Sequence, residues 1–380
     1  MPTNKMYSVP PAFGYMLKHA RTTAGLTLQN VSNSTGLAVS TISETESGKR
    51  RVSAVELYMF SRLYSRPITY FFEEDESSAS FAVLLRAANN IAVKRETFIK
   101  FHELCLNYRH LRKIVGAPEM PSPPDYSDSK LTSLEDAEDI AESERSSLGL
   151  DGQPIRDICE LLGGKRGAKV FHMPEDSEAF SGAFAYDENL GPCFLINSNQ
   201  PVLRRAFTAA HEYAHCIAHR DQLAHIDSST TFESRNPRER FANTFAAAFL
   251  MPRRTVNEVL SQLVSRHSSS ITPEIIIRLA LYFGVSFEAA GWRLVSMRRL
   301  PLSHWQHLLT EKYPSSPTAR LLGYHNEIEE VDLLPRNYTY LAYAAYKAKH
   351  ISFERLAELL QRNYYELEEE FALENRSSND

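Results

Sequence analysis

The residues His211, Glu212 and His215 have the types and the spacing of a metal-dependent hydrolytic site. Two histidines four positions apart lie on one face of an α-helix, where both imidazoles can bind the same ion. The glutamate after the first histidine can hold and deprotonate a metal-bound water, the general-base role in zinc peptidases. Residues 204–218 contain no proline or glycine and carry an apolar stripe at helical spacing, so we expect a helix there.

A third ligand is expected from a second helix, which begins at Pro237 and ends before Pro252. Glu239 follows His215 by 24 positions, which leaves room for a loop and an antiparallel return. Its carboxylate would complete a site of two histidines and one glutamate, with one position left open for water. The alternatives are a solvated helix whose glutamate has no metal role, and Glu233 as the third ligand, although Glu233 lies outside the expected helix.

Two blocks around these residues closely resemble the ImmA/IrrE family of zinc metallopeptidases. They are FTAAHEYAH at 207–215 and ERFANTFAAAFLMP at 239–252, in the family's order. Upstream, Ser181-Gly182 and Leu195-Ile196-Asn197 are similar to the small sheet of that family. Tyr213-Ala214 stands where the family often has Leu-Gly. The resemblance implies a zincin-like helical domain with a small β-sheet.

The same resemblance implies the roles of the site residues. His211, His215 and Glu239 would bind one Zn²⁺ per chain, and Glu212 would be the catalytic base. The implied activity is narrow, namely cleavage of one repressor-like protein, which releases a set of genes. The group that stabilises the oxyanion stays open between Tyr186, the histidines of the loop between the two helices, and the metal itself.

Two further histidines lie near the motif. His219 follows His215 by four positions and shares its helical face, but a fourth ligand would close the site, so we expect it to support His215 or to pack at the surface. His225 lies with Asp227 in a Ser/Thr-rich loop between the two expected helices. Cys216 adjoins His215 but points away from the ligand face, so we do not assign it to the metal.

The composition is that of an ordinary soluble globular protein. A chain of 380 residues with 43% hydrophobic and 23% charged residues suggests two or three domains. We expect a cytoplasmic protein with no membrane partner, because the start lacks a secretory signal and no apolar run approaches the roughly 20 residues of a membrane span. The scattered cysteines are expected to be reduced thiols; they are Cys105, Cys159, Cys193 and Cys216.

Residues 1–70 form a basic module on an acidic body. They carry eight Lys and Arg against three Glu, a net +5 in a chain of net charge −5, which suggests a polyanionic partner for this end. We expect five short helices, at 12–24, 28–34, 41–46, 54–64 and 68–72, with Ser40 capping the third. The pattern GLT at 25–27, GLAVSTIS at 36–43 and ESGKR at 46–50 resembles the Cro/cI-type XRE family of helix-turn-helix proteins.

The resemblance implies binding to double-stranded DNA through the third helix in the major groove. The residues implied to contact DNA are Gln29, Ser40, Thr41, Ser43, Glu44, Lys49, Arg50 and Arg51. Two features differ from the family pattern. Leu28 replaces a glutamine that binds phosphate in the family, and the expected recognition helix lacks Arg and Lys, so direct contacts to bases are expected to be weak. The alternative is a module that docks a protein, such as the substrate of the peptidase.

The whole chain is expected to be mainly α, in the α+β class. We expect a helix-turn-helix domain (1–76), a long helix at 80–115 and a Pro-rich linker (77–129), the zinc metallopeptidase domain (130–300) and a small helical C-terminal unit (301–380). A seam from Phe101 to Val115 is expected to pack on a neighbouring domain, with a homodimer as the alternative. Helices are expected at 134–148 and 155–162, and strands at 168–172, 180–186 and 193–196.

The function that follows is a stress-response or transcription regulator that acts as a site-specific zinc endopeptidase. The competing hypothesis is a DNA-binding transcriptional regulator whose zinc domain senses a ligand or partner without proteolysis. The two hypotheses predict opposite effects for Glu212, because only hydrolysis needs its carboxylate as a base.

Overall fold

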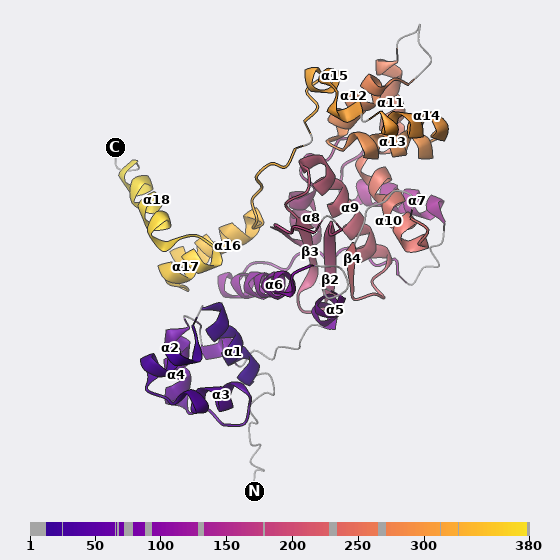
Figure 1. The fold of residues 1–380 in the computed structure, drawn as a ribbon. Coiled ribbons are helices and arrows are strands. Elements are labelled where there is room, and N and C mark those ends of the chain that lie inside the picture. Colours follow the sequence, from indigo (N-terminus) through magenta and orange to yellow (C-terminus); the bar gives the residue numbers. More distant parts are fainter. Residues whose placement is uncertain are drawn as a thin grey trace. The chain divides into compact units, whose positions relative to one another are not determined.

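The computed structural model describes residues 13–24, 26–64, 66, 68–71, 79–87, 93–127, 133–177, 179–227, 234–264, 271–311, 313–325 and 327–377. The chain divides into two compact units, Met1–Ser78 and Ala79–Asp380 (Figure 1). The described part of the first unit is helical, and the second combines helices with one small sheet. The mainly α, α+β class expected from the sequence is correct.

The first unit is a small helical domain with a core of its own. Its described elements are α1 (Phe13–Thr23), α2 (Leu28–Thr35), α3 (Val39–Glu46), α4 (Ala54–Leu63) and the 3₁₀ turn η1 (Ile68–Phe71). Thr27 and Ser53 cap α2 and α4, each in a reciprocal capping box with the third helical residue. The apolar faces of the helices enclose a core that includes Leu17, Val31, Ile42 and Phe60.

Two expected features of this unit are wrong in detail. α3 begins at Val39, because the backbone changes from extended to helical at Ala38, so Ser40 lies inside the helix and does not cap it. The last element is a 3₁₀ turn of four residues, too short for α-helical hydrogen bonding to continue.

A buried ion pair connects the first and third helices: Arg21 Nε lies 2.6 Å from Glu46 Oε1.

The second unit is organised around a four-stranded mixed sheet in the order β1-β3-β2-β4. The strands are β1 (Lys169–Met173), β2 (Gly182–Asp187), β3 (Gly191–Asn197) and β4 (Ala224–Asp227). β1 runs parallel to β3, whereas β2 is antiparallel to both β3 and β4. The sequence predicted the first three strands within a few residues. It missed β4, because the alternation of apolar and polar residues in Ala224–Asp227 extends over only four positions, too few to distinguish a strand from a loop.

Both faces of this sheet are buried. One face packs on α9 (Val202–Ala218), and the other packs on α5 (Ala79–Ala87) and α6 (Arg95–Val115). Along β3, Phe194 and Ile196 belong to the core that contains α9, while Leu195 belongs to the core that contains α6. Successive strand residues point to opposite faces, which explains why these strands read as continuous apolar runs.

Further helices complete the core around α9. They are α7 (Leu134–Ser147), α8 (Ile158–Arg166), α10 (Pro237–Leu250), α11 (Arg253–Leu263), α12 (Pro273–Phe283) and α13 (Phe287–Ser296). α8 begins three residues later than expected, because Asp157 is its N-cap and accepts a hydrogen bond from the Glu160 backbone N–H. It then runs on to Gly167, whose positive φ of 65° ends the helix.

The single long helix expected at 80–115 is wrong. α5 ends at Ala87 and α6 begins at Arg95, with Lys94 in an extended conformation before it. Val93 lies outside both helices and buries its side chain in the core of the sheet's second face.

The Pro-rich segment after α6 is held against the end of α9. The Tyr126 backbone N–H donates to the Ile217 carbonyl (2.7 Å), and Arg220 Nη2 donates to the Pro124 carbonyl (3.0 Å). The described part of this segment, up to residue 127, is therefore part of the second unit and does not act as a free linker.

The expected boundary after residue 300 crosses a continuous core. α14 (Leu302–Thr310) and α15 (Pro317–Leu321) contribute Trp305, Leu308 and Ala319 to the core that holds α9. The final helices are α16 (Arg336–Lys347), α17 (Phe353–Leu359) and α18 (Tyr364–Ser377), and α16 packs on α6. That packing uses the apolar seam of α6, where Tyr108 contacts Tyr338.

Among the described helices, no single one is long and apolar enough to span a membrane. α12 and α13 reach that length and composition only together, and the chain bends by 105° between them.

Gly291 of α13 provides a test of this core, because an added Cβ would lie 2.2 Å from Trp305 Cη2. We expect Gly291→Ala to lower the free energy of unfolding by about 1–3 kcal/mol, although alanine favours a helix over glycine by about 1 kcal/mol. The measurement is denaturant unfolding followed by tryptophan fluorescence, since both tryptophans of the chain, Trp292 and Trp305, contact this core. Gly164→Ala in α8 is the control: its added Cβ meets nothing within 4 Å, so stability should not fall. Equal stability of both variants would contradict the packing described.

Candidate metal centre

Helices α9 and α10 bring the residues of the predicted site together. Asn236 caps α10 and Pro237 is its first residue, which places Glu239 in the first turn of the helix. His211 and His215 are fully buried on α9, and the Glu239 side chain keeps 16% of its surface exposed. The site is therefore enclosed on the helix side and accessible beside the glutamate.

The spacing of the three donor groups fits a tetrahedral zinc ion. His211 Nε2 and His215 Nε2 lie 3.1 Å apart, and they lie 3.3 and 3.5 Å from the two carboxylate oxygens of Glu239. Zinc–ligand bonds of about 2.0–2.1 Å at tetrahedral angles separate the ligand atoms by about 3.3 Å. The residues could therefore hold one ion without a change of rotamer.

The protonation of Glu239 and His215 also suits a metal, whereas at His211 the effect of burial is outweighed by the hydrogen bond to Glu239, which raises the pKa of the imidazole. Burial opposes ionisation of Glu239, but hydrogen bonds from His211 and His215 lower the pKa of its carboxyl below the usual range. Burial, with the neighbouring His225, lowers the pKa of His215, which favours the neutral imidazole that binds metals. A carboxylate and a neutral imidazole are thus present together.

Glu212 lies beside this group with both carboxylate oxygens buried and without a hydrogen-bond partner among the described residues. Burial and the nearby Asp227 and Glu239 raise its pKa well above the usual value for a glutamate. Buried polar atoms are rarely left unpaired, so this carboxyl is a sign of an additional bound species. Gly182 of β2 makes room for it: an added Cβ would lie 3.0 Å from the Leu195 carbonyl and 3.4 Å from Glu212 Cγ.

Two residues behind the donors hold the imidazoles in place. His211 Nδ1 lies 3.0 Å from Asn243 Oδ1, one turn after Glu239 on α10. His215 Nδ1 lies 3.0 Å from His219 Nδ1, which agrees with the supporting role expected for His219. Such partners fix ring orientation and the tautomer of a metal ligand. Asn243 was not singled out from the sequence, although its four-residue spacing from Glu239 places it on the same face.

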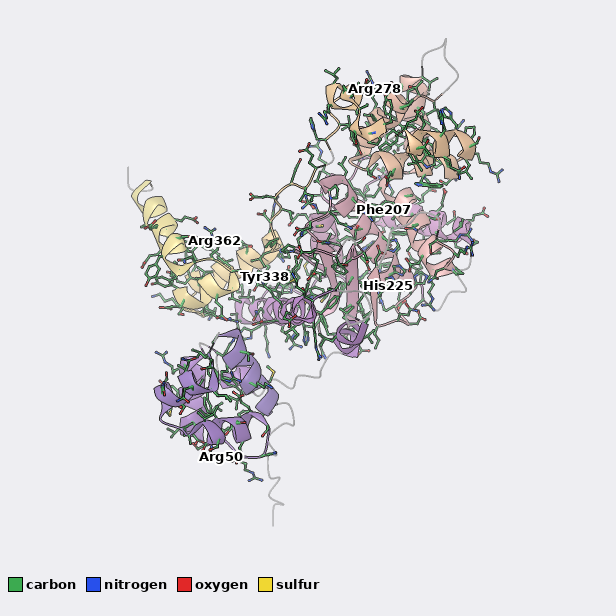
Figure 2. All side chains as sticks on the ribbon, in the orientation of Figure 1. Arg50, Phe207, His225, Arg278, Tyr338 and Arg362 are labelled. Atoms are coloured by element: carbon green, nitrogen blue, oxygen red, sulfur yellow. The ribbon has the colours of Figure 1, made fainter. Side chains whose placement is uncertain are left out.

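His225 is the residue of the centre that sequence analysis left in a loop. It lies on the edge strand β4, opposite Phe184 of β2 (Figure 2). Its Nε2 lies 3.3 Å from Glu239 Oε1, and its ring stacks on His215 with centroids 4.0 Å apart and an interplanar angle of 23°. The four residues His211, His215, His225 and Glu239 each place a donor atom within 4.8 Å of the others.

The ring geometry separates His225 from the three expected ligands. The rings of His211 and His215 are inclined by 63°, so their nitrogens can converge on one point. The rings of His215 and His225 are nearly parallel, so their in-plane lone pairs cannot both be directed at one ion. In this arrangement His225 faces the metal position from the sheet side and is not one of the convergent donors.

Two buried arginines hold the end of α10. Arg145 Nη1 donates to the Phe249 carbonyl (2.6 Å), and Arg293 Nε donates to the Met251 carbonyl (3.0 Å). Both cations lie at the C-terminal end of the helix, where unpaired carbonyls and the helix dipole favour positive charge. These contacts fix α10, and with it Glu239, relative to α9.

Tyr213 accounts for one departure from the pattern of the ImmA/IrrE family, which the motif resembles. Its ring packs between α9 and α10, and its hydroxyl donates to Glu144 Oε2 of α7 at 2.5 Å. Arg166 completes the group, with Nη2 at 3.0 Å from the same carboxylate oxygen. A tyrosine where the family often has leucine therefore adds a polar tie between α7, α8 and α9.

The remaining expectations for this centre have different outcomes. Glu233, the alternative third ligand, lies outside the described residues. Tyr186, a candidate for stabilising the oxyanion, stacks with the Arg220 guanidinium, whose Cζ lies 4.2 Å from the centre of the tyrosine ring. Cys216 is buried in the core and takes no part in the donor group.

The residues expected to contact DNA lie on the surface of the first unit. Gln29, Ser40, Ser43, Glu44, Lys49 and Arg51 are exposed, and Thr41 is half-buried. Arg50, labelled in Figure 2, is different: its Nη2 lies 2.8 Å from Glu56 Oε1. That ion pair engages Arg50 within the domain, so Lys49 and Arg51 are the better candidates for phosphate contacts.

Comparison with known proteins supports a metallopeptidase. Residues 165–295 match the family model of a peptidase domain described as the IrrE N-terminal-like domain. This segment carries His211, Glu212, His215, His225 and Glu239, and it covers about a third of the chain. No curated protein matches the sequence. The match supports the ImmA/IrrE resemblance for this segment, and it does not extend to the first unit.

The convergence of three donors predicts which substitutions release a metal. We expect the purified chain to bind about one zinc per molecule, and His215→Ala to lose it, because two remaining donors cannot complete a tetrahedral site. His225→Ala should keep one zinc per chain, since its ring is stacked and not convergent. Elemental analysis after dialysis against a weak chelator measures both. Zinc loss in the His225 variant alone would contradict this assignment.

Proposed function

We propose that the chain is a zinc-dependent endopeptidase that cleaves a repressor-like protein and thereby regulates transcription. The observation that supports it most is the convergence of His211, His215 and Glu239 beside the unpartnered, buried Glu212. The family match covers all four residues. The proposal that the substrate resembles a repressor rests on the ImmA/IrrE resemblance and on the accompanying helix-turn-helix pattern.

The chain's own residues supply the proton transfers of peptide hydrolysis in this proposal. A zinc ion in the site would act as a Lewis acid and lower the pKa of water in its vicinity towards about 7. Glu212 accepts the proton of the attacking water on a carboxylate oxygen and passes it to the leaving amine. His211, His215 and Glu239 hold the ion, while Asn243 and His219 hold the two imidazoles in place.

Strand β4 gives this centre a place for an extended substrate. It is the edge strand next to the donor group, and it carries His225. An extended peptide can add to a sheet edge through main-chain hydrogen bonds, which would place its carbonyl groups beside Glu239.

Glu212→Gln separates hydrolysis from metal binding. The variant should keep its zinc, because Glu212 is not one of the donors, and should cleave about 10²–10⁴-fold more slowly, because the amide cannot accept the proton. The measurement is proteome-wide labelling of new N-termini in the source cells after induction of either protein. Wild type should generate new termini in a small number of proteins, and Glu212→Gln should not.

Glu142→Gln is the control, since this exposed carboxylate on α7 lies outside the donor group. Equal cleavage by wild type and Glu212→Gln would overturn the hydrolytic role. If neither protein generates new termini while both change transcription equally, the non-proteolytic regulator is correct instead.

We further propose that the first unit binds double-stranded DNA. The exposed polar residues of α3 and the exposed Lys49 and Arg51 after it support this proposal. The basic excess of residues 1–70 favours association with a polyanion. The homodimer considered from the α6 seam gains no support, because Phe101, Leu104, Tyr108 and Leu111 are buried within the second unit.

The salt dependence of DNA binding tests this proposal. Each phosphate contact contributes about 0.9 to the slope of log K against log salt concentration. We expect Arg51→Ala to weaken binding and to lower that slope by about 1, while Arg62→Ala, an exposed arginine on α4 outside the proposed interface, leaves the slope unchanged. Fluorescence anisotropy with duplex DNA at several salt concentrations measures it. A flat salt dependence would favour the protein-docking alternative.

A further inference from the structure

Two pockets in the described part of the second unit share one wall, away from the donor group. The larger, of about 630 Å³, is enclosed mainly by α8, β1, the first turn of α9 and the segment 329–337. The smaller, of about 570 Å³, is lined by Ser198, Asn199 and the segment 328–333. Residues 329–332 line both pockets, and we call them the acidic ridge. Neither the three expected metal ligands nor Glu212 or His225 line either pocket.

The acidic ridge is held in place through its backbone. Arg205 Nη2 donates to the Glu329 carbonyl (3.1 Å), and the His172 backbone N–H donates to the carbonyl of Leu333, directly after the ridge (3.0 Å). The side chains of Glu329, Glu330 and Asp332 remain exposed. Because the wall is already ordered, a partner that binds to it loses little conformational entropy in the chain.

The charges that line the two pockets have a negative excess. Five carboxylates stand against three arginines; they are Asp157, Glu160, Glu329, Glu330 and Asp332, and Arg156, Arg205 and Arg336. The smaller pocket is lined by the three ridge carboxylates, and its lining residues include no Lys, Arg or His. Arg205 is buried beside Glu329, whose carboxylate compensates part of its charge. Burial, followed by the charge of Arg205, lowers the pKa of His172 to about 4, so this imidazole adds no positive charge near pH 7.

This excess excludes several classes of partner. Nucleic acids and anionic membrane surfaces would be repelled, the more so because residues 71–380 carry a net charge of −10 when residues 1–70 contribute +5 to a total of −5. The ridge carboxylates do not converge on a metal ion either. Among the described residues, only the donor group of α9, α10 and β4 places its ligand atoms close enough together. The pockets therefore suit an organic cation.

Apolar side chains beside the ridge indicate what else the partner carries. Val170, Val202 and Leu334 line the larger pocket, and Ile328, which is 63% exposed, lines the smaller one. Apolar surface bordered by charged groups is the usual composition of a protein–protein interface. A partner that fits both pockets has aliphatic groups next to positive charges.

We propose that the acidic ridge and its two pockets dock a segment of a partner protein in which aliphatic side chains stand next to lysine or arginine. The aliphatic side chains enter the pockets, and the basic side chains lie over Glu330 and Asp332. Complementary charge both selects such a partner and speeds its association. Basic segments are common in proteins that bind nucleic acids, so a repressor-like substrate is one such partner. The docking does not rest on zinc or on peptide hydrolysis, so the two proposals can fail separately.

Isothermal titration of the full-length protein tests the charge preference with two short peptides, SVKLRS and its neutral analogue SVQLQS. We expect one saturable site for the basic peptide, with the neutral peptide bound at least about tenfold more weakly at low salt. The affinity of the basic peptide should fall as salt is added, because salt screens exposed charges. Equal binding of the two peptides, or no saturable binding of SVKLRS at millimolar concentration, would overturn the proposal.

Reversal of the ridge charges tests whether the peptide binds there. We expect the double variant Glu330→Lys, Asp332→Lys to bind SVKLRS at least about tenfold more weakly than wild type does. The matched control is Asp139→Lys, Glu142→Lys, which changes the net charge equally at two exposed positions of α7 outside both pockets. The control should bind as wild type does. An equal loss in both double variants would show that only net charge matters and would reject the ridge.

Gly164→Leu tests the larger pocket without a change of charge. Gly164 lines this pocket on α8, and an added Cβ there meets nothing within 4 Å, so the leucine should be accommodated in the fold and fill space in the pocket. We expect weaker binding of SVKLRS, whereas Gln262→Leu, an exposed position of α11 outside both pockets, should leave it unchanged. Wild-type affinity in Gly164→Leu would place the peptide elsewhere. Zinc content, measured in parallel, should be the same in all variants.

Discussion

The burial of a polar donor group between α9 and α10 is the constraint on which the second unit depends. His211, Glu212 and His215 are completely inaccessible to solvent, in a helix whose other faces are apolar. Polar groups in such a position must find partners, because water cannot reach them. Glu239 and Asn243 of α10 and His219 of α9 supply those partners, and only Glu212 is left without one. The buried Glu212 carboxyl without a hydrogen-bond partner is therefore the strongest indication that the centre binds a further species.

The contacts around the centre hold α9 and α10 in a fixed position relative to one another. Arg145 and Arg293 bind the final carbonyls of α10, and Tyr213 ties α9 to Glu144 of α7. The sheet supports α9 from the other side, and Gly182 allows the backbone of β2 to approach Glu212 closely. These contacts come from four separate regions of the chain. A small displacement of α10 would move Glu239 out of reach of both histidines, so this rigidity has a functional purpose.

The proposals on function place two kinds of recognition on one chain. The first unit presents polar and basic side chains suited to a phosphate backbone, and the donor group lies beside a sheet edge suited to an extended peptide.

The sequence alone determined the features that depend on local spacing. The i, i+4 histidines, the neighbouring glutamate and the Pro-capped second helix follow from helical periodicity, and the structure places His211, His215 and Glu239 together as that periodicity predicts. Most helix positions and three strands were also predictable, because capping residues and apolar runs mark them locally. The roles of these residues in catalysis and DNA binding remain predictions.

Tertiary structure alone decided the features that depend on distant segments. The strand β4 and the position of His225 result from pairing with β2, because a run of only four residues carries too weak a local signal. The interruption between α5 and α6 and the attachment of residues 302–324 to the core around α9 arise from burial of Val93 and Trp305. Burial depends on every element that packs around a residue, and a single sequence records only the residues that are adjacent along it.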